Sequence, residues 1–150
     1  MTAAGPAAAE TATGGTGRRH VHEFAVRFAD VDMYRHVNNV TFVRYLEDAR
    51  TAMMFIDPVK RGAAPVGGCV VHRHEVDYLR PLDFRVEPVR ILTGVRDITA
   101  VTFTLDHELV DDTACYLRAS TVLAAYDVEE ARPRRLRPDE RAYLAGFAAA

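Results

Sequence analysis

The chain contains one long helical pattern, which is followed by a series of strand-like runs. Apolar residues recur at helical spacing at Phe42, Leu46, Ala49 and Met53, which predicts a helix from Asn39 to about residue 55. Such a helix must bury its apolar stripe against another element, because exposing apolar surface to water is unfavourable. The rest of the chain therefore has to supply the surface that covers this helix.

The covering surface is predicted to be a sheet. Apolar and polar residues alternate in the manner of strands over 23–28, 69–79, 89–95, 101–110 and 114–126. The reversals between the last three runs are short, which favours antiparallel pairing. We therefore expect an α+β fold, in which one long central helix is wrapped by a curved antiparallel sheet of about five strands.

Length and charge fit a single domain with terminal extensions. A chain of 150 residues is the size of one domain, and a net charge of −2 gives no reason to expect a nucleic-acid partner. Residues 1–20 are rich in Ala, Gly and Thr and do not resemble a secretory signal, so we expect a disordered tail there. The domain is expected over 21–128, and residues 129–150 are expected to form a C-terminal tail with a short helix near 139–147.

Two further features bear on compartment. No apolar run approaches the ~20 residues of a membrane-spanning helix, so we expect a cytoplasmic protein without a membrane partner. Cys69 and Cys115 are the two cysteines, and both lie among apolar residues. We expect them to be buried, reduced thiols.

Acid–base side chains are concentrated between the first strand-like run and the helix. Asp30, Asp32, His36, Asn38 and Asn39 all fall in this connection. Asn is a preferred helix N-cap, so part of this pattern serves to start the helix. A carboxylate there also lies near unpaired N–H groups and the positive end of the helix dipole, which favours its ionised form. Because the same N–H groups can polarise a carbonyl oxygen, the connection could carry both a base and an electrophile-binding site.

The motif resembles that of a known family of enzymes. The pattern D-x-D-x-x-x-H-V-N-N over 30–39, followed by R-Y-L-E-D-A-R over 44–50, is similar to the hotdog-fold acyl-CoA thioesterases. The nearest branches are the 4-hydroxybenzoyl-CoA thioesterase-like family and the plant acyl-ACP thioesterases. V-D-Y-L-R-P over 76–81 resembles the family's strand that ends in a Tyr-x-x-Pro turn. The resemblance covers about residues 21–127.

The resemblance implies a hotdog fold and hydrolysis of an acyl-CoA or acyl-ACP thioester. It also implies a homodimer or homotetramer with active sites between subunits, and no cofactor beyond the coenzyme A of the substrate. Asp32 holds the place of the catalytic acid and would be a nucleophile or a general base, with His36 as a donor or water-positioning group. Tyr34 stands where the plant enzymes have Asn, so either Asp32 works without that partner or Tyr34 lines the acyl pocket.

The same resemblance suggests how the substrate binds. Asn38 and Asn39 are candidates for substrate contact, and the N–H groups near Asn39 and Val40 are candidate oxyanion donors. Family members carry basic residues at the reversal after the third strand, where they meet coenzyme A phosphates. Here that reversal contains Arg96, and Arg80 is a second candidate for the phosphates; Arg73 and Arg118 are further ones.

Several other assignments remain open. Asp30 could bind turn amides or an arginine such as Arg27, or it could form a coupled pair with Asp32. Glu47 on the helix could be the catalytic carboxylate, as in some thioesterase branches. Cys69 could be a nucleophile activated by the nearby His72 or His74, and we do not expect this role. His72 and His74 are predicted to share one strand face and, with Glu75, could bind a metal ion; we do not expect a metal site either.

Two other functions compete with thioester hydrolysis. A hotdog hydratase or dehydratase would carry an Asn-Pro pair after the aspartate, but Met33 and Tyr34 follow Asp32 here. A non-catalytic acyl-CoA-binding module is the other alternative, and binding without turnover would distinguish it.

Overall fold

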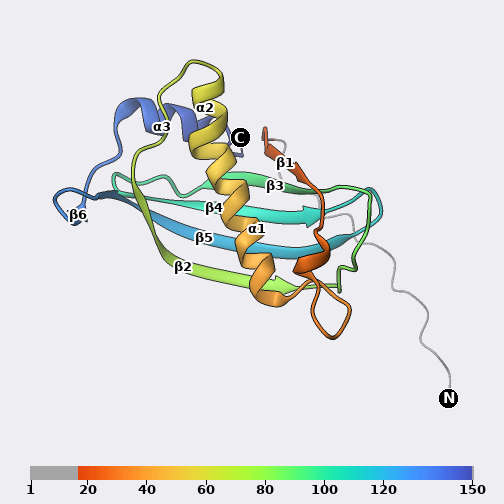
Figure 1. The fold of residues 1–150 in the computed structure, drawn as a ribbon. Coiled ribbons are helices and arrows are strands. Elements are labelled where there is room, and N and C mark those ends of the chain that lie inside the picture. The colour runs from red at the N-terminus through yellow and green to blue at the C-terminus, as the bar shows by residue number, and fades with distance from the viewer. Residues whose placement is uncertain (1–16, 150) are drawn as a thin grey trace.

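A computed structural model describes residues 17–149 (Figure 1). Most of the predicted N-terminal tail, residues 1–16, lies outside the described residues, while His20 already begins a strand. The described elements are β1 (His20–Phe24), the 3-10 turn η1 (Phe28–Asp30), α1 (Asn39–Thr51), the π-helical η2 (Ala52–Ile56), α2 (Asp57–Lys60), β2 (Cys69–Tyr78), β3 (Val89–Arg96), β4 (Thr102–Val110), β5 (Cys115–Asp127), β6 (Arg132–Pro133) and α3 (Pro138–Ala145).

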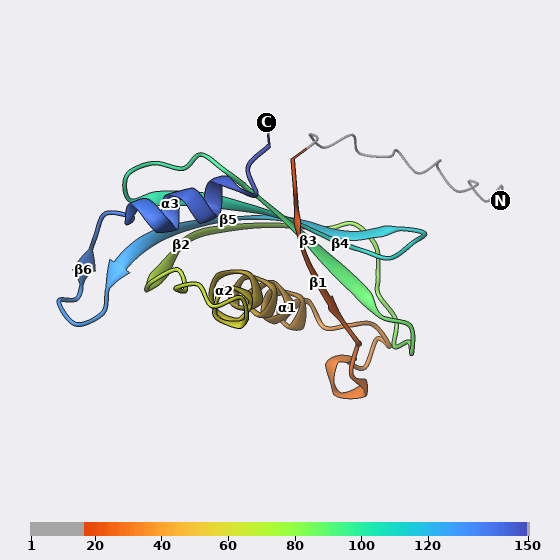
Figure 2. The ribbon, with the colours of Figure 1, turned by 90° about the horizontal axis from the view of Figure 1, so that it is seen from above.

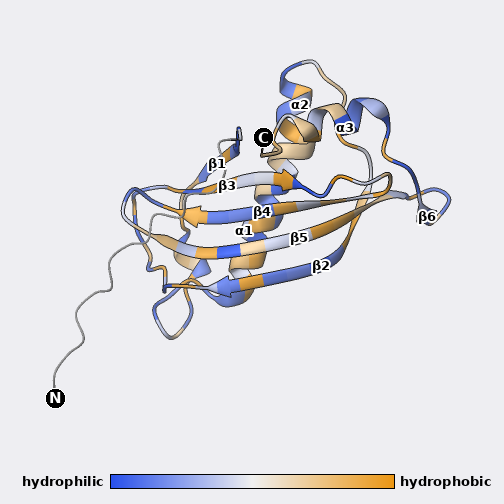
Figure 3. Ribbon diagram, turned by 180° about the vertical axis from the view of Figure 1, so that it is seen from behind, coloured by the Kyte–Doolittle hydropathy of each residue, from blue (hydrophilic) through white to orange (hydrophobic). Residues whose placement is uncertain are grey.

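The five long strands form one curved antiparallel sheet in the order β1-β3-β4-β5-β2. α1 lies across the concave face of this sheet, as the view from above shows (Figure 2). Seen from behind in Figure 3, β2 consists of hydrophilic residues along most of its length. The predicted α+β fold with a helix wrapped by an antiparallel sheet is therefore confirmed.

The first strand ends earlier than predicted. Alternation of apolar residues extended it to Phe28, whereas β1 ends at Phe24 and Phe28 begins a 3-10 turn. The turn forms because Arg27 donates its backbone N–H to the Asp30 carboxylate at 3.0 Å. Phe28 is consequently 80% exposed instead of facing the core.

The helix continues beyond the predicted end near residue 55 and reaches Lys60. Pro58 lies beyond that predicted end, in the first turn of α2, where a missing N–H is tolerated. The Met54 carbonyl that Pro58 cannot bond accepts the Val66 N–H at 2.9 Å. In the π-helical turn the Asp57 N–H bonds the Ala52 carbonyl, which leaves the Met53 carbonyl to the Tyr143 hydroxyl at 2.5 Å.

A β-bulge changes the faces of β2. The pairing with β5 shifts by one residue between Val71 and Arg73, so His72 is the extra residue. The prediction that His72 shares a face with His74 is therefore wrong, because periodicity does not reveal a bulge. Instead Val71 lies opposite the buried Leu123, and His74 opposite the buried Thr121.

The core between helix and sheet has two apolar clusters with a polar row between them. One cluster surrounds Leu46 and Leu117, and the other surrounds Met53 and Phe103. The row crosses the sheet and α1 and consists of Thr93, His107, Thr121, His74 and Arg50. Burial and then the Arg50 charge lower the pKa of His107 to about 3, so this buried imidazole is neutral at physiological pH.

The segment after β5 joins the fold. Leu136 lies in the segment predicted as a C-terminal tail, but it is buried together with Leu144 and Phe147 of the predicted terminal helix. Phe147 accepts the Val95 N–H at 3.0 Å, so the chain end lies beside β3 beyond β1. The segment expected as a tail over 129–150 thus closes one end of the core. Within residues 17–149, none of the helices combines the length and apolar character needed to cross a membrane.

Candidate active site

The motif forms a short loop between the 3-10 turn and α1. Val31 and Val37 form an antiparallel bridge at the base of the loop. Asp32 donates its N–H to the His36 carbonyl at 3.0 Å, and Arg35 donates its N–H to the Asp32 carbonyl at 2.9 Å. Arg35 adopts a left-handed conformation with φ 64°, which tightens this reversal. The loop therefore has a defined shape that holds Asp32 near the helix start.

Asp32 is half-buried, and both of its carboxylate oxygens have donors. The Tyr34 N–H donates to Oδ1 at 2.9 Å, and the Asn38 side-chain amide donates to Oδ2 at 3.2 Å. Both donors stabilise a carboxylate in one orientation. Asp32 is thus held in one orientation while it remains partly accessible to solvent.

Asp30 binds an arginine and a turn amide, which is the first of the two alternatives that the sequence left open for it. It is 4% exposed, and its carboxylate accepts hydrogen bonds from the Arg27 guanidinium at 2.9 Å and the Tyr45 hydroxyl at 2.6 Å. Burial would raise the pKa of Asp30, but the hydrogen bonds from Arg27 and Tyr45 outweigh burial and lower it. No hydrogen bond joins Asp30 and Asp32 among the side chains of residues 17–149, so nothing favours a shared proton.

The helix start differs in one respect from the prediction. Asn38 is the N-cap, and its side-chain oxygen accepts the Val40 N–H at 2.9 Å. Val40 is therefore occupied by the cap and cannot donate to a substrate oxygen without losing it. Within residues 17–149, the N–H groups of Asn39 and Thr41 have no acceptor. These two amides, rather than Val40, are available at the positive end of the helix.

Asp32, Tyr34 and His36 lie between two hollows in the surface, of about 550 Å³ and 390 Å³. The larger hollow includes Phe28, Asp83 and Phe84. The smaller one adds apolar and aromatic walls from the helix start and the end of β2, namely Val37, Asn39, Phe42, Tyr78, Leu79, Arg80 and Pro81. Asn39, Tyr34 and Asp32 therefore share one surface cavity.

His36 is exposed at the edge of both hollows. Its Nε2 lies 3.5 Å from Oδ1 of Asp83, and backbone pairing joins the same two residues. Its side chain is 46% exposed, so it is free to reorient toward a ligand. Tyr34 is exposed as well and can cover the cavity without displacing core residues.

The two arginines predicted to bind phosphate have different surroundings. Arg80 lies at the edge of the smaller hollow, next to Pro81. Arg96 instead pairs with Asp97 and, at 2.6 Å, with Asp106 on the far end of β3 and β4. Arg96 borders neither hollow at Asp32, and its contact with a coenzyme A phosphate stays a prediction. Asp97 lies in the same reversal as Arg96, and Asp106 lies on the neighbouring strand. The sequence pattern did not show that these carboxylates bind the arginine.

The other candidate residues do not gather at Asp32. Glu47 points from α1 to solvent and lies 3.5 Å from Arg50. Burial raises the pKa of the Cys69 thiol to about 11, so it is a poor nucleophile. In the part of the chain that the structure describes, no group of three or more His, Cys, Asp or Glu side chains could hold a metal ion.

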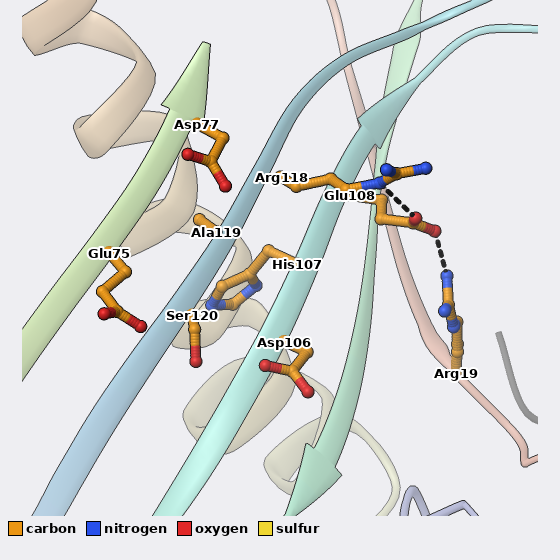
Figure 4. A pocket seen from close by; sticks show the side chains of 9 residues that line it. All are labelled: Arg19, Glu75, Asp77, Asp106, His107, Glu108, Arg118, Ala119 and Ser120. Carbon is orange, nitrogen blue, oxygen red and sulfur yellow. Dashed lines mark hydrogen bonds and ion pairs between the residues drawn. The ribbon is translucent and has the colours of Figure 1, made fainter. Parts of the chain in front are cut away.

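Another pocket lies on the outer face of the sheet, away from Asp32 (Figure 4). It has a volume of about 260 Å³ and combines carboxylates of β2 and β4 with Arg19 and Arg118. Glu108 binds both arginines, so the charges there largely satisfy one another. Arg118, a further candidate for the phosphates, thus lies on the face of the sheet opposite α1. Arg73, another candidate, pairs with Glu75 on β2.

Two tyrosines of the site were not identified from the sequence. Tyr45 is buried on the second turn of α1 and bonds Asp30, although its helical position predicted only packing. Tyr78 donates its hydroxyl to the Asn39 carbonyl at 3.2 Å and lies against the Phe42 ring, 5.8 Å between centroids. The Tyr-x-x-Pro pattern was the signal for Tyr78, but its partner on the helix depends on the fold.

Comparison with known proteins supports this picture. A predicted thioesterase from Bacillus stearothermophilus has a TM-score of 0.74 and 21% identity, covering 87% of this chain and 97% of that chain, which shows the fold. A putative thioesterase from Pseudomonas aeruginosa is 26% identical, with a TM-score of 0.72 and coverage of 83% and 98%. A thioesterase complexed with coenzyme A and Zn from Thermus thermophilus is also 26% identical, with a TM-score of 0.69 and coverage of 85% and 92%.

The two comparisons of sequence give different results. No curated protein matches the chain significantly. However, residues 26–144 match the sequence pattern of the thioesterase-like superfamily, a range that includes the loop with Asp32 and the whole sheet after it. This confirms the resemblance that the motif suggested, and the chain belongs to the thioesterase-like superfamily of hotdog-fold thioester hydrolases.

Proposed function

We propose that this protein is an acyl-CoA thioesterase in which Asp32 is the catalytic carboxylate. The observation that carries the proposal is the position of Asp32. Its carboxylate is held by Tyr34 and Asn38 beside the unpaired N–H groups of Asn39 and Thr41, and it borders an apolar hollow. A thioester needs a nucleophile or base on one side and donors to its carbonyl oxygen on the other, and this arrangement offers both.

The reaction could begin in two ways. As a nucleophile, Asp32 bonds to the thioester carbon, the C–S bond breaks, and the thiolate takes a proton from solvent; water then hydrolyses the mixed anhydride. As a general base, Asp32 takes a proton from water while the water oxygen bonds to the carbon, and the proton passes to the departing sulfur. In both routes the Asn39 and Thr41 N–H groups donate to the oxyanion, and coenzyme A leaves as the thiol.

Substrate binding follows from the walls of the cavity. Phe42 and Tyr78 offer an apolar surface to the acyl group, and the exposed Tyr34 and His36 lie over its entrance. Arg80 at the edge is the proposed contact for a phosphate of coenzyme A or of a phosphopantetheine-bearing carrier protein. No other cofactor takes part in the proposal.

We propose in addition that two copies assemble along β2. Among residues 17–149, β2 pairs with β5 alone, and its Val70 and Val71 are about two-fifths exposed. An unpaired edge with exposed valines is suited to pairing with another strand. A second copy there would cover the side of the hollow that Tyr78 leaves open.

The test is a thiol-release assay on short, long and aromatic acyl-CoAs, with the matching acyl-ACPs in parallel. Asp32→Asn keeps the size of the side chain but removes its charge, so kcat should fall about 10³-fold. Asp112→Asn, at an exposed aspartate between β4 and β5 that borders neither hollow, is the matched control and should keep full activity. A folded Asp32→Asn protein with the activity of the wild type would overturn the mechanism.

A further inference from the structure

The tip of the loop with Asp32 has few contacts with the core, and its far side is fixed by Val37, which is buried and donates its N–H to the Leu82 carbonyl at 2.7 Å. The side chains of Met33 and Tyr34 are exposed, and Asp32 itself is held by groups of the same loop and the N-cap. Such a loop would sample several positions relative to α1 unless its base were fixed. The position of the carboxylate therefore depends on what anchors the residues just before it.

Asp30 provides that anchor, and it does so with every atom that can accept a hydrogen bond. Its carbonyl accepts the Asn38 N–H at 2.9 Å, at the start of α1. Its Oδ2 accepts the Tyr45 hydroxyl at 2.6 Å and the Arg27 N–H at 3.0 Å. Its Oδ1 accepts the Arg27 guanidinium at 2.9 Å. Asp30 thus ties the strand end, the loop and the helix together at one buried point.

Tyr45 makes this anchor part of the helix. It is 4% exposed, and its ring packs against Phe24 at 4.5 Å and Phe42 at 6.2 Å between centroids, so it cannot move independently of the core. Burial and the hydrogen bond to Asp30 raise the pKa of Tyr45 above its usual value, so its hydroxyl remains a donor at physiological pH. Arg27, by contrast, is largely exposed and closes the anchor from the solvent side.

We propose that Arg27, Asp30 and Tyr45 form a positioning clamp that sets the distance and orientation between Asp32 and the first N–H groups of α1. The proposal rests on the proposed function of Asp32. None of the three side chains borders the two hollows at Asp32, so they act through the loop and are not catalytic residues themselves. Because a misplacement of about 1 Å can cost about 100-fold in rate, a small loosening of the clamp should be visible in kcat.

The sharpest variant is Tyr45→Phe, which removes one hydroxyl and keeps the packed ring. Its matched control is Tyr143→Phe, which removes a hydroxyl that donates to the Met53 carbonyl at the other end of the helix. The clamp predicts that kcat falls about 10-fold in Tyr45→Phe with KM within about twofold, while both stay near the wild type in Tyr143→Phe. Arg27→Gln, at an exposed position, weakens the clamp without opening a core cavity and should also lower kcat.

Amide hydrogen exchange gives a second readout that needs no activity. Exchange over residues 31–38 should become at least about 10-fold faster in Tyr45→Phe and Arg27→Gln, and should not change in Tyr143→Phe. If Asp32→Asn is inactive while Tyr45→Phe and Arg27→Gln keep the wild-type kcat and exchange, the clamp is refuted and the proposed function survives. If Asp32→Asn keeps full activity, the proposed function is refuted, and unchanged loop exchange in Tyr45→Phe would refute the clamp separately.

Discussion

Asp30 and Asp32 are separated by one residue and have opposite surroundings. The 3-10 turn directs Asp30 into the space between β1 and α1, where Tyr45 and Arg27 bind it. The bridge between Val31 and Val37 then turns the chain outward, so Asp32 reaches the surface hollow. A charged group with three donors in the interior suits a structural role, and a half-exposed one with an open edge suits chemistry on a substrate.

The side-chain oxygen of Asn38 caps the helix, and its side-chain amide donates to Asp32. The two functions can be separated by mutation. Asn38→Asp keeps an N-cap oxygen, so the free energy of unfolding should change by less than about 0.5 kcal/mol. However, it replaces the amide that donates to Asp32 with a second carboxylate. The acid limb of the pH profile of kcat/KM should therefore move to higher pH by about one unit, because like charges disfavour ionisation.

The control for that change is Asn38→Ser, which keeps a cap oxygen, loses the amide donor and adds no charge. It should lower activity without moving the pH profile. Identical pH profiles for the Asp and Ser variants would show that the side chain of residue 38 does not face the ionised Asp32.

At the scale of elements, the continuous helix from Asn39 to Lys60 and the edge strand β2 decide where a ligand can enter. The π-helical turn lets the helix continue past Pro58, and Tyr143 and Val66 bind the carbonyls that this turn releases. β2 lies at the sheet edge with its inner face partly uncovered, from Val71 through His74 to Tyr78. The side of the site next to β2 is therefore the one that a second copy would complete.

Lysines on that edge test the proposed assembly. In a twofold edge-to-edge dimer the same residues lie near one another, so the double variant Val70→Lys, Val71→Lys should bring like charges together. We expect the wild type to have twice the chain mass by size exclusion with light scattering, and the double variant to be monomeric and less active. Val21→Lys, on the exposed opposite edge strand β1, should remain dimeric. A monomeric wild type with full activity would contradict the assembly.

For the whole molecule, the C-terminal segment completes the core that the sheet and α1 leave open. Leu136, Leu144 and Phe147 fill the second apolar cluster. Glu140 fixes this segment: it is 2% exposed and accepts hydrogen bonds from Arg134 at 2.8 Å and from the Gly67 N–H at 2.7 Å. Burial would raise the pKa of Glu140, but these bonds and the Arg137 N–H lower it from 4.5 to about 2.

Glu140→Gln should lower the free energy of unfolding at pH 7 by about 3 kcal/mol, because it removes the buried carboxylate that binds the partly buried Arg134. Since the folded-state pKa is depressed, the stabilisation is present above pH 4.5 and is lost as the pH falls toward 2. Urea unfolding at several pH values should therefore show the wild type and the variant converging at low pH. Glu129→Gln, at an exposed position, should match the wild type throughout, and a constant gap down to pH 2 would contradict the assignment.

The sequence by itself determined the elements and the motif. The spacing of Phe42, Leu46, Ala49 and Met53 placed α1, and Asn38 marked its start, because periodicity and capping are decided within one or two turns of chain. The motif predicted Asp32 beside the helix start, and its resemblance identified the family that the profile match confirms. The partnership of Arg27 with Asp30 was also predictable, since three residues separate them.

The tertiary structure alone decided which distant groups meet. It brought the Tyr45 hydroxyl to Asp30, fifteen residues earlier in the chain, and it placed two carboxylates beside Arg96. It also directed the Val40 N–H to the side chain of the N-cap Asn38. It also placed a bulge at His72 and drew Leu136 and Glu140 into the interior. These outcomes depend on strand register and on the closure of long loops, which local patterns do not encode because many distant pairings are compatible with the same periodicity.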